Sequence, residues 1–311
     1  MKYVFIINPK AGDGKFVENI ESKILACFSK NNHQYEIHKT VNKGDANKCV
    51  KTLCKTGEEI TFVSCGGDGT IHEIINSMIA YDNAKLAIMP LGSGNDFVRN
   101  FENTEKFMDI DAIIKGKTEK IDLLKVNGEY VATVGNVGYD ADVAFNMTKF
   151  KRCPLLTGRG RYNISLIYSL IHKIGKELTY TFDDGTVMVH NLLLGVVANG
   201  QTYGSGYKCA PYASINDGIL DVCLMKKMTR IQIVQMINSY KNGNHLDDKK
   251  LSNYMIYKKC KNVRLTSEKD IHLCVDGELM EGNDFYFECI EKGIKFVMPE
   301  GSKIIQGRKK D

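Results

Sequence analysis

The sequence has no apolar run long enough to cross a membrane. The longest unbroken run lies near Leu192–Ala198, far below the ~18–20 residues that a membrane-spanning helix needs. The first ten residues form a short strand-like stretch, and they lack the small-residue cleavage site of a signal peptide. We therefore expect a cytoplasmic protein without a membrane span, for which peripheral contact with the inner membrane surface stays open.

Patterns of metal ligands and disulfides are also missing. The ten cysteines are scattered without a CxxC pair, and none of the seven histidines has a partner at ligand spacing. We expect reduced cysteines that pack as small hydrophobic residues, as at Cys65 and Cys223. The net charge of +5 is too small to predict nucleic-acid binding, but it suits anionic nucleotides and membranes.

Neither the GxxxxGK[ST] loop nor the GxGxxG dinucleotide fingerprint is present. Instead, the stretch Ser64–Glu73, SCGGDGTIHE, joins an apolar strand to a predicted helix over Ile71–Ala80. Its glycines can take positive φ and remove Cβ atoms near a ligand, and the turn's N–H groups attract phosphate. Asp68 would repel phosphate unless a cation lay between them. The turn therefore predicts a nucleotide and metal site.

Strands and helices alternate through the first third of the chain. This order predicts an α/β fold with a parallel sheet and helices on both faces. Because ligands bind outside the carboxyl ends of such strands, the loops that follow strands should form one site. The predicted strands are Lys2–Ile7, Gln34–Thr40, Ile60–Ser64 and Leu86–Met89, and the loops are Asn8–Lys15, Gly66–Thr70 and Gly92–Asp96.

From about Ile121 the sequence is rich in strand patterns. Asn127-Gly128 is a strong two-residue hairpin signal, and helices are expected at Tyr162–Lys173 and Thr229–Tyr240. We predict a second, all-β domain built as an antiparallel sandwich. The expected domains are residues 1–122 and 123–311, with the extreme C-terminus packing back on the first.

Three motifs resemble the diacylglycerol kinase catalytic family, above all its soluble bacterial diacylglycerol and lipid kinases, which are related to sphingosine kinases. They are Asn8–Gly12, the turn Gly66–Thr70 with Glu73, and Pro90–Asp96, PLGSGND. GGDGT also occurs in NAD kinases, and phosphofructokinases have a related turn. The pairing of GGDGT with PLGSGNDF is specific to the lipid kinases. The resemblance implies a first domain like that of phosphofructokinase and NAD kinase.

The resemblance implies that ATP binds along these loops. It also implies that Asp68 and Asp96 organise a catalytic Mg²⁺, partly through water, which agrees with the few carboxylates that Mg²⁺ takes. An alternative for Asp96 alone is a helix N-cap. The implied ATP-binding residues are Asn8, Pro9, Lys10, Ala11, Gly12, Thr40, Gly66, Gly67, Asp68, Gly69, Thr70, Ile71, His72, Glu73, Ser93 and Asn95.

A second carboxylate signal is Asp276-Gly277-Glu278. In the family the Asp of this DGE is the general base and the Glu supports it, either by orienting it or through the metal network. Asp276-Gly277 also has the composition of a hairpin turn, and the two interpretations are compatible. Phosphoryl transfer to an alcohol needs a carboxylate that takes the hydroxyl proton. We therefore expect the active site in the cleft between the domains.

Two further segments carry open alternatives. The resemblance implies a structural Mg²⁺ held by the Asp217 carboxylate and the carbonyls of Ser214 and Ile219, whereas the sequence Asn-Asp-Gly here also forms ordinary turns. Lys149–Lys173 combines basic residues with an amphipathic stretch. It is either a contact for an anionic membrane or a core helix preceded by a solvated loop.

We predict an ATP- and Mg²⁺-dependent lipid kinase that converts diacylglycerol to phosphatidic acid, with a homodimer suggested by the family. A sphingoid base, monoacylglycerol, phosphatidylglycerol or an isoprenoid alcohol are alternative acceptors, because an apolar cleft discriminates weakly among them. The rivals are an NAD kinase and a non-catalytic nucleotide- or lipid-binding regulator. The PLGSGNDF loop argues against the first, and the joint presence of Asp68, Asp276 and Glu278 argues against the second.

Overall fold

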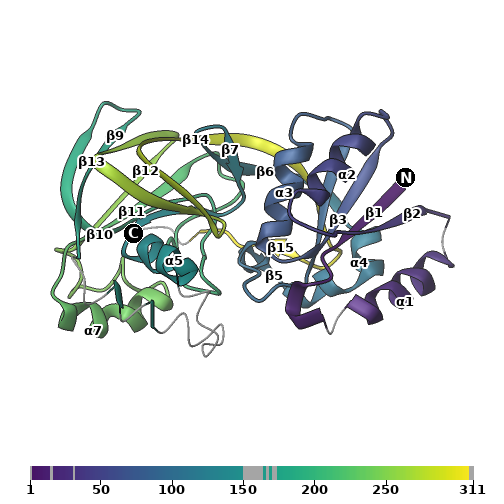
Figure 1. Cartoon of the computed structure of the whole chain (residues 1–311), viewed down its shortest axis with the longest axis horizontal. Helices are drawn as coiled ribbons and strands as arrows, with labels where there is room; N and C mark the ends of the chain where they lie inside the picture. Colours follow the sequence, from purple (N-terminus) through teal and green to yellow (C-terminus); the bar gives the residue numbers. More distant parts are fainter. Residues whose placement is uncertain are drawn as a thin grey trace.

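Four apolar strands of the N-terminal lobe form the parallel sheet that the sequence predicts. In the computed structural model, which describes residues 2–14, 17–30, 32–149, 164–165, 168–169 and 174–307, their order is β2-β1-β3-β4 (Figure 1). All neighbouring pairs are parallel. The strands are β1 (Lys2–Ile7), β2 (Gln34–Lys39), β3 (Ile60–Gly66) and β4 (Ala84–Pro90).

Alternating residues of these strands enter two separate cores. On β1, Val4 and Ile6 pack with α2 (Asp45–Cys54) and α3 (Asp68–Met78), whereas Phe5 and Ile7 pack with α1 (Val17–Phe28) and α4 (Ile110–Ile114). Successive side chains of a strand point to opposite faces, so a strand that is apolar throughout needs helices on both sides. Because helices cover both faces of the sheet, the edge at the carboxyl ends of the strands is the one left open. Short elements, η1 (Ala11–Gly14), η2 (Phe97–Asn100), β5 (Phe101–Glu102) and η3 (Thr104–Met108), connect the layers.

The second lobe is a mostly antiparallel sandwich around its own core. Its strands β12, β11, β10, β8, β13 and β14 are neighbours in that order, β9 lies between β10 and β13, and β6 pairs with β14 and β7. The predicted Asn127-Gly128 turn joins β6 and β7, with positive φ at both residues. The strands are β6 (Lys117–Val126), β7 (Glu129–Val131), β8 (Val134–Gly138), β9 (Lys176–Phe182), β10 (Val187–Ala198), β11 (Leu220–Lys226), β12 (Met255–Cys260), β13 (Asn262–Val275) and β14 (Glu278–Met298).

The long strand β14 belongs to both lobes. Its first part pairs with β13, its last part pairs with β6, and Phe296 is the parallel partner of Leu86 on β4. Beyond it, β15 (Lys303–Ile304) pairs with β5. Strand β15 thus lies on the first lobe, whereas Gln306 and Gly307, at the end of the described chain, lie against residues 212–216 of the second lobe. The domain boundary predicted after residue 122 falls inside β6 and stays a prediction.

Two helices of the second lobe bear on the site. Helix α5 (Tyr139–Lys149) follows β8 directly, and α7 (Arg230–Lys241) begins with a capping box in which Thr229 and Gln232 bind each other's backbone N–H.

The predicted segment Lys149–Lys173 lies almost wholly outside the described residues. Among the helices that the structure describes, none is long and apolar enough to cross a membrane. No disulfide joins the cysteines of the described ranges.

Replacing Phe296 with alanine should destabilise the junction between β14 and the first lobe. The ring is fully buried and contacts the rings of Phe97, Phe101 and Phe107 at centroid distances of 5.5, 5.1 and 6.3 Å. We expect a loss of about 3–5 kcal/mol in the free energy of unfolding, measured by urea denaturation. Tyr286→Ala, at a side chain of the same strand that is 46% exposed, is the control. Equal losses in both variants would contradict this.

Candidate functional site

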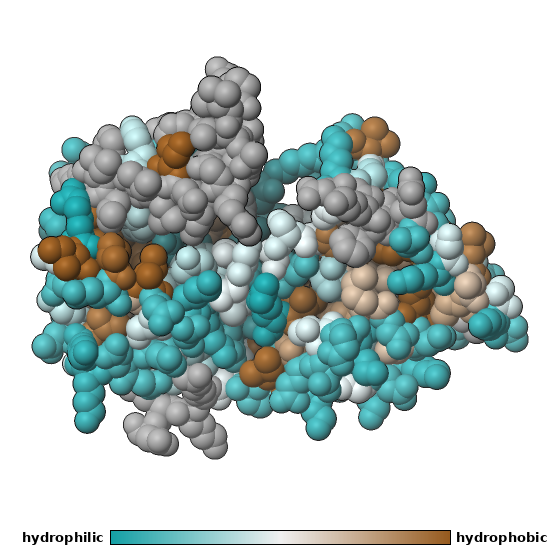
Figure 2. All heavy atoms as spheres, turned by 90° about the horizontal axis from the view of Figure 1, so that it is seen from below, coloured by the Kyte–Doolittle hydropathy of each residue, from teal (hydrophilic) through white to brown (hydrophobic). Residues whose placement is uncertain are grey.

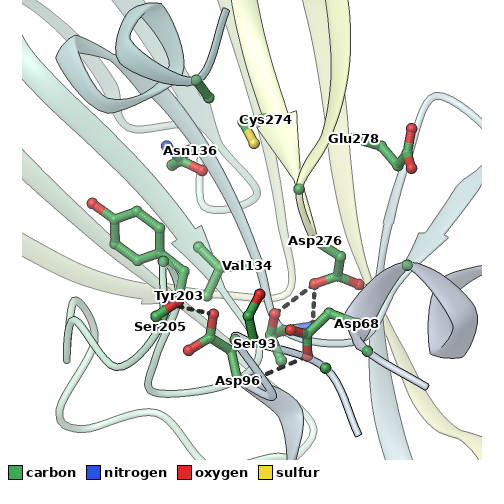
Figure 3. Close-up of a pocket in the computed structure, with 18 of the residues that line it drawn as sticks. Asp68, Ser93, Asp96, Val134, Asn136, Tyr203, Ser205, Cys274, Asp276 and Glu278 are labelled. Carbon is green, nitrogen blue, oxygen red and sulfur yellow. Dashed lines mark hydrogen bonds between the residues drawn. The ribbon is translucent and has the colours of Figure 1, made fainter. Parts of the chain in front are cut away.

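The predicted loops and the hairpin of the second lobe meet at one cavity of about 810 Å³. Loops after β1, β2, β3 and β4 line one side, and residues from β8, β10, α5, α7 and the β13–β14 hairpin line the other. Figure 3 shows Asp68, Asp96 and Asp276 close together in this cavity, although they come from three distant parts of the sequence. The cavity therefore lies between the lobes, as the sequence predicts.

Close backbone contact explains the glycines of two loops. A Cβ atom on Gly92 would lie 2.4 Å from the Cα of Gly67, and one on Gly66 would lie 2.4 Å from Thr70 Oγ1. None of Gly66, Gly67 and Gly69 has a positive φ, so the turn does not use the left-handed conformations that glycine allows. Gly67 and Gly92 are needed because the GGDGT and PLGSGND loops touch there through their main chains, and Gly66 leaves room for the Thr70 side chain of its own turn. At Gly69 the space for a Cβ is open.

Asp68 and Asp96 are held by backbone N–H groups of other loops. Helix α3 begins at Asp68, three residues before the predicted start. Asp68 Oδ1 accepts hydrogen bonds from the N–H groups of Asp96 and Phe97 at 2.9 and 3.3 Å. The Asp96 carboxylate accepts from Ser205 and Gly206, both at 2.9 Å. Asp96 occupies the N-cap position of η2, as the alternative predicts, but its side chain makes no capping hydrogen bond there.

Asp276 is held in the same way by the start of the second lobe. Its carboxylate accepts from Ala132 N at 2.6 Å, from Thr133 N at 3.1 Å and from Thr133 Oγ1 at 2.5 Å. The side chain is only 3% exposed. Asp276 and Gly277 have φ of 46° and 89° and join the adjacent ends of β13 and β14, as in a type I′ turn. The predicted hairpin turn is confirmed.

The aspartates make the cavity electrostatically negative. Burial, with smaller contributions from the carboxylates of Asp96 and Asp276, raises the pKa of Asp68 to about 6. Burial also raises the pKa of Asp96, against the hydrogen bonds from Ser205 and Gly206. A cation bound here would remove this repulsion, and carboxylate oxygens are suitable ligands for Mg²⁺. Because no three acidic, histidine or cysteine side chains converge as metal ligands in the described ranges, phosphate or water oxygens would have to complete the shell.

Most of the predicted nucleotide residues line this cavity. Asn8 donates weakly to Thr70 Oγ1 at 3.5 Å, and the Thr40 N–H donates to Ile7 O at 2.9 Å. The first bond ties the loop after β1 to the GGDGT turn, and the second ties the loop after β2 to the end of β1. The predicted residues that line the cavity are Asn8, Lys10, Ala11, Gly12, Thr40, Gly67, Asp68, Gly69, Thr70, Glu73, Ser93, Asp96, Asp276 and Glu278.

Other predicted residues support the site from behind. Pro9, Gly66, Ile71, His72 and Asn95 are not among the residues that line the cavity. The Ile71 side chain packs in the core, and the Asn95 side chain accepts from Gly92 N at 2.9 Å and donates to Gly92 O at 2.8 Å, which closes the loop. Glu73 also lines the cavity, and it accepts from Gly44 N at the start of α2.

His72 lies on the face of α3 that points toward the second lobe. Its Nδ1 lies 4.0 Å from Asp276 Oδ2, and its Nε2 lies 3.6 Å from Glu129. Burial lowers the pKa of His72, but the carboxylates of Asp276, Glu129 and Glu278 outweigh this and raise it overall. The residue thus lies beside the hairpin that carries Asp276.

Glu278 pairs with a lysine of the first lobe. Lys43 Nζ donates to Glu278 Oε2 at 2.6 Å, which joins the loop after β2 to the start of β14. In Figure 3 the Glu278 carboxylate points away from that of Asp276. The contacts that the structure describes for these two residues therefore include no direct support of Asp276 by Glu278.

The predicted structural metal site lies apart from the cavity. The Asp217 carboxylate is bound by Lys259, whose Nζ lies 3.0 Å from Asp217 and 3.3 Å from Asp221. Ser214 Oγ donates to Asn216, and Ile219 immediately precedes β11. A metal ion bound at Asp217 would have to displace an ammonium group that the β11–β12 register places there, since Asp221 and Lys259 are direct partners. The predicted ligands therefore do not form a Mg²⁺ site while Lys259 is paired with Asp217.

Several residues of the site were not predicted from the sequence. Thr133, Ser205 and Gly206 hold the aspartates, and Lys43 pairs with Glu278. The Gly-Ser-Gly run at residues 204–206, which follows β10, is a signal of the same kind as the loops of the first lobe.

Part of the cavity is apolar, and its lining there includes Val134, Val143, Leu193, Leu194, Ile233 and Met236.

The chain is similar to known lipid kinases over nearly its full length. The family described as diacylglycerol kinase catalytic domain matches residues 2–126, and the YegS C-terminal NAD kinase beta sandwich-like domain matches residues 132–297. A diacylglycerol kinase of Bacillus subtilis (strain 168) is 25% identical over 298 residues, 95% of each chain. The "Probable lipid kinase YegS-like" of Alcanivorax borkumensis is 22% identical over 98% of this chain and 99% of its own.

Solved structures show the same fold. A crystal structure of a diacylglycerol kinase from Bacillus anthracis superposes with a TM-score of 0.70 at 21% identity, covering 98% of each chain. A parallel-sheet lobe with GGDGT and PLGSGND loops, joined to a sandwich that carries a DGE hairpin, matches both family domains in order. This chain therefore belongs to the diacylglycerol kinase family of lipid kinases.

Proposed function

We propose that this protein transfers the γ-phosphate of ATP, with Mg²⁺, to the hydroxyl of a membrane lipid, and that the acceptor is diacylglycerol. The observation that carries the proposal is the position of Asp276. Its carboxylate shares a cavity with the glycine-rich loops of the first lobe and with the apolar lining of the second. A nucleotide and an apolar alcohol can therefore meet beside one carboxylate.

In this proposal the loops after β1, β3 and β4 hold the triphosphate. The N–H groups at the start of α3 and the open space at Gly69 suit phosphate oxygens. Asp68 and Asp96 would hold Mg²⁺, which neutralises charge on the β- and γ-phosphates during transfer. The first lobe thus binds and orients the donor, and its carboxylates set the position of the phosphate that is transferred.

Asp276 would accept the proton of the lipid hydroxyl. An ionised carboxylate has about four lone-pair sites, and three of those of Asp276 are used by Ala132 and Thr133. The remaining site can bind the acceptor hydroxyl while the other bonds fix the orientation of the carboxylate. The apolar lining would hold the acyl chains and exclude water, so that the lipid rather than water takes the phosphate.

The other acceptors remain chemically close. A sphingoid base, monoacylglycerol, phosphatidylglycerol or an isoprenoid alcohol also presents a hydroxyl on an apolar body. Diacylglycerol is proposed because the chain is similar over nearly its full length to a protein named diacylglycerol kinase. An NAD kinase would not need the apolar lining, and a regulator would not need Asp276. A homodimer and peripheral membrane contact are part of the proposal.

Labelling the product tests the proposed function directly. The protein is incubated with γ-labelled ATP, Mg²⁺ and a total lipid extract, and in parallel with NAD⁺, and the labelled products are separated by chromatography. We expect label in phosphatidic acid, and none in NADP⁺. Label in another lipid would correct the acceptor, and label only in NADP⁺ would overturn the lipid kinase proposal.

Asp276→Asn should abolish most of the turnover but keep ATP binding. Loss of a general base typically lowers the rate ~10²–10⁴-fold, and Asn is compatible with the positive φ of 46° at this position. We expect kcat to fall by this factor while the Kd of a non-hydrolysable ATP analogue stays within about twofold. Asp284→Asn, on β14 and paired with Arg264, is the control. Wild-type kcat in Asp276→Asn would remove this residue from the mechanism.

Mg²⁺ affinity should fall in acid because Asp68 must lose its proton to bind a cation. The pKa of Asp68 is raised to about 6 in the metal-free protein. The carboxyl is therefore mostly ionised above this pH and mostly protonated below it. We expect titration calorimetry with an ATP analogue to show up to ~10-fold weaker binding per pH unit below 6. Asp68→Asn, whose remaining pH dependence comes from Asp96 and the triphosphate, is the reference, and identical slopes in the two proteins would contradict this.

A further inference from the structure

Helix α7 is apolar on two faces. Its inner face packs Ile233, Met236 and Tyr240 into the core of the second lobe. On its outer face Ile231, Val234 and Ile237 are 72%, 61% and 42% exposed. Three exposed β-branched residues spaced three apart lie along one side of a helix, and Figure 2 shows apolar residues gathered at the α7 end of this lobe. A helix that only covers the sandwich would need apolar residues on one face alone.

The outer row is continuous with the apolar lining of the cavity. Ile233, Met236 and Ile237 line the cavity, and Ile237 is exposed at the same time. One turn of α7 therefore separates the outer surface from the site in which an acyl chain would lie. An apolar molecule that moves from Ile231 and Val234 past Ile237 would stay in contact with apolar side chains until it enters the cavity.

The charged residues of α7 and of the chain just before it are all basic, and the nearest acidic residues in sequence after the helix are Asp247 and Asp248, of which Asp248 binds Ser239 on α7. Between residues 226 and 246 the chain contains Lys226, Lys227, Arg230 and Lys241 and no aspartate or glutamate. The first three lie at or just before the start of the helix, and Lys241 is its last residue. Basic residues at both ends of an exposed apolar row are typical of a helix that lies in the interface of an anionic bilayer.

We propose that α7 is the surface with which this protein docks on an anionic bilayer, with Ile231 and Val234 inserted among the acyl chains and Ile237 at the entrance for the acceptor. The proposal rests on the proposed function, because only a lipid acceptor has to pass from a bilayer into the cavity. An enzyme without a membrane-spanning helix in its described part can then extract its substrate without exposing the acyl chains to water.

Vesicle binding of the full chain tests the docking surface. The variant Ile231→Ser/Val234→Ser leaves Ile237 and the cavity unchanged. The matched control is Val187→Ser/Val189→Ser on β10, whose side chains are 56% and 54% exposed. Sedimentation with vesicles of phosphatidylcholine and about one-third phosphatidylglycerol should show ~10-fold or greater loss of binding for the α7 variant and less than about twofold for the control. Vesicles of phosphatidylcholine alone should bind the wild type more weakly.

Kinetics separate docking from chemistry. The α7 variant should phosphorylate diacylglycerol in vesicles more slowly than the wild type, but short-chain diacylglycerol dissolved as monomers at the same rate. Wild-type vesicle binding by the α7 variant would overturn the proposal, as would a change from dimer to monomer with no loss of vesicle binding, which would assign the row to a second copy of the chain. A third outcome separates the two proposals. If the wild type binds vesicles but phosphorylates no lipid, and the α7 variant loses this binding, the docking surface is supported and the proposed function fails.

Discussion

The site depends on hydrogen bonds from main-chain N–H groups to three aspartates. Asp68 binds the loop after β4, Asp96 binds the loop after β10, and Asp276 binds the chain between β7 and β8. Each carboxylate is thus both a functional group and the support of a segment distant in sequence. Bonds between an ionised carboxylate and N–H groups are about twice as strong as neutral ones. Buried negative charges can therefore stay close together before any cation is bound.

The two lobes cannot be assembled independently around this site. Strand β14 begins at the DGE hairpin, runs through the sandwich and ends in the core of the first lobe at Phe296. The ion pair between Lys43 and Glu278 joins the lobes a second time, at the rim of the cavity. Because the proposed base is attached to the strand that enters the donor lobe, its position relative to the glycine-rich loops is set by the backbone.

Much of the fold follows from the sequence, and the site follows in part. The Asn127-Gly128 turn and the apolar strand β1 could be predicted because the local conformational preference of their residues agrees with the tertiary structure. The α/β lobe and the sandwich are confirmed. The contact of Gly67 with Gly92 could not be read from the sequence, since it depends on the distance between two loops. The same holds for Lys43 and Lys259, whose partners are set by tertiary packing and strand register.

The left-handed backbone at Asp276 restricts how this family member can change. At φ of 46° followed by Gly277, asparagine and glycine are the natural replacements for aspartate, and β-branched or bulky residues would strain the hairpin. A single base change from an aspartate to an asparagine codon would therefore remove the charge and preserve the fold. In the proposed mechanism, this one mutation would leave the cavity without its base and with its lining unchanged.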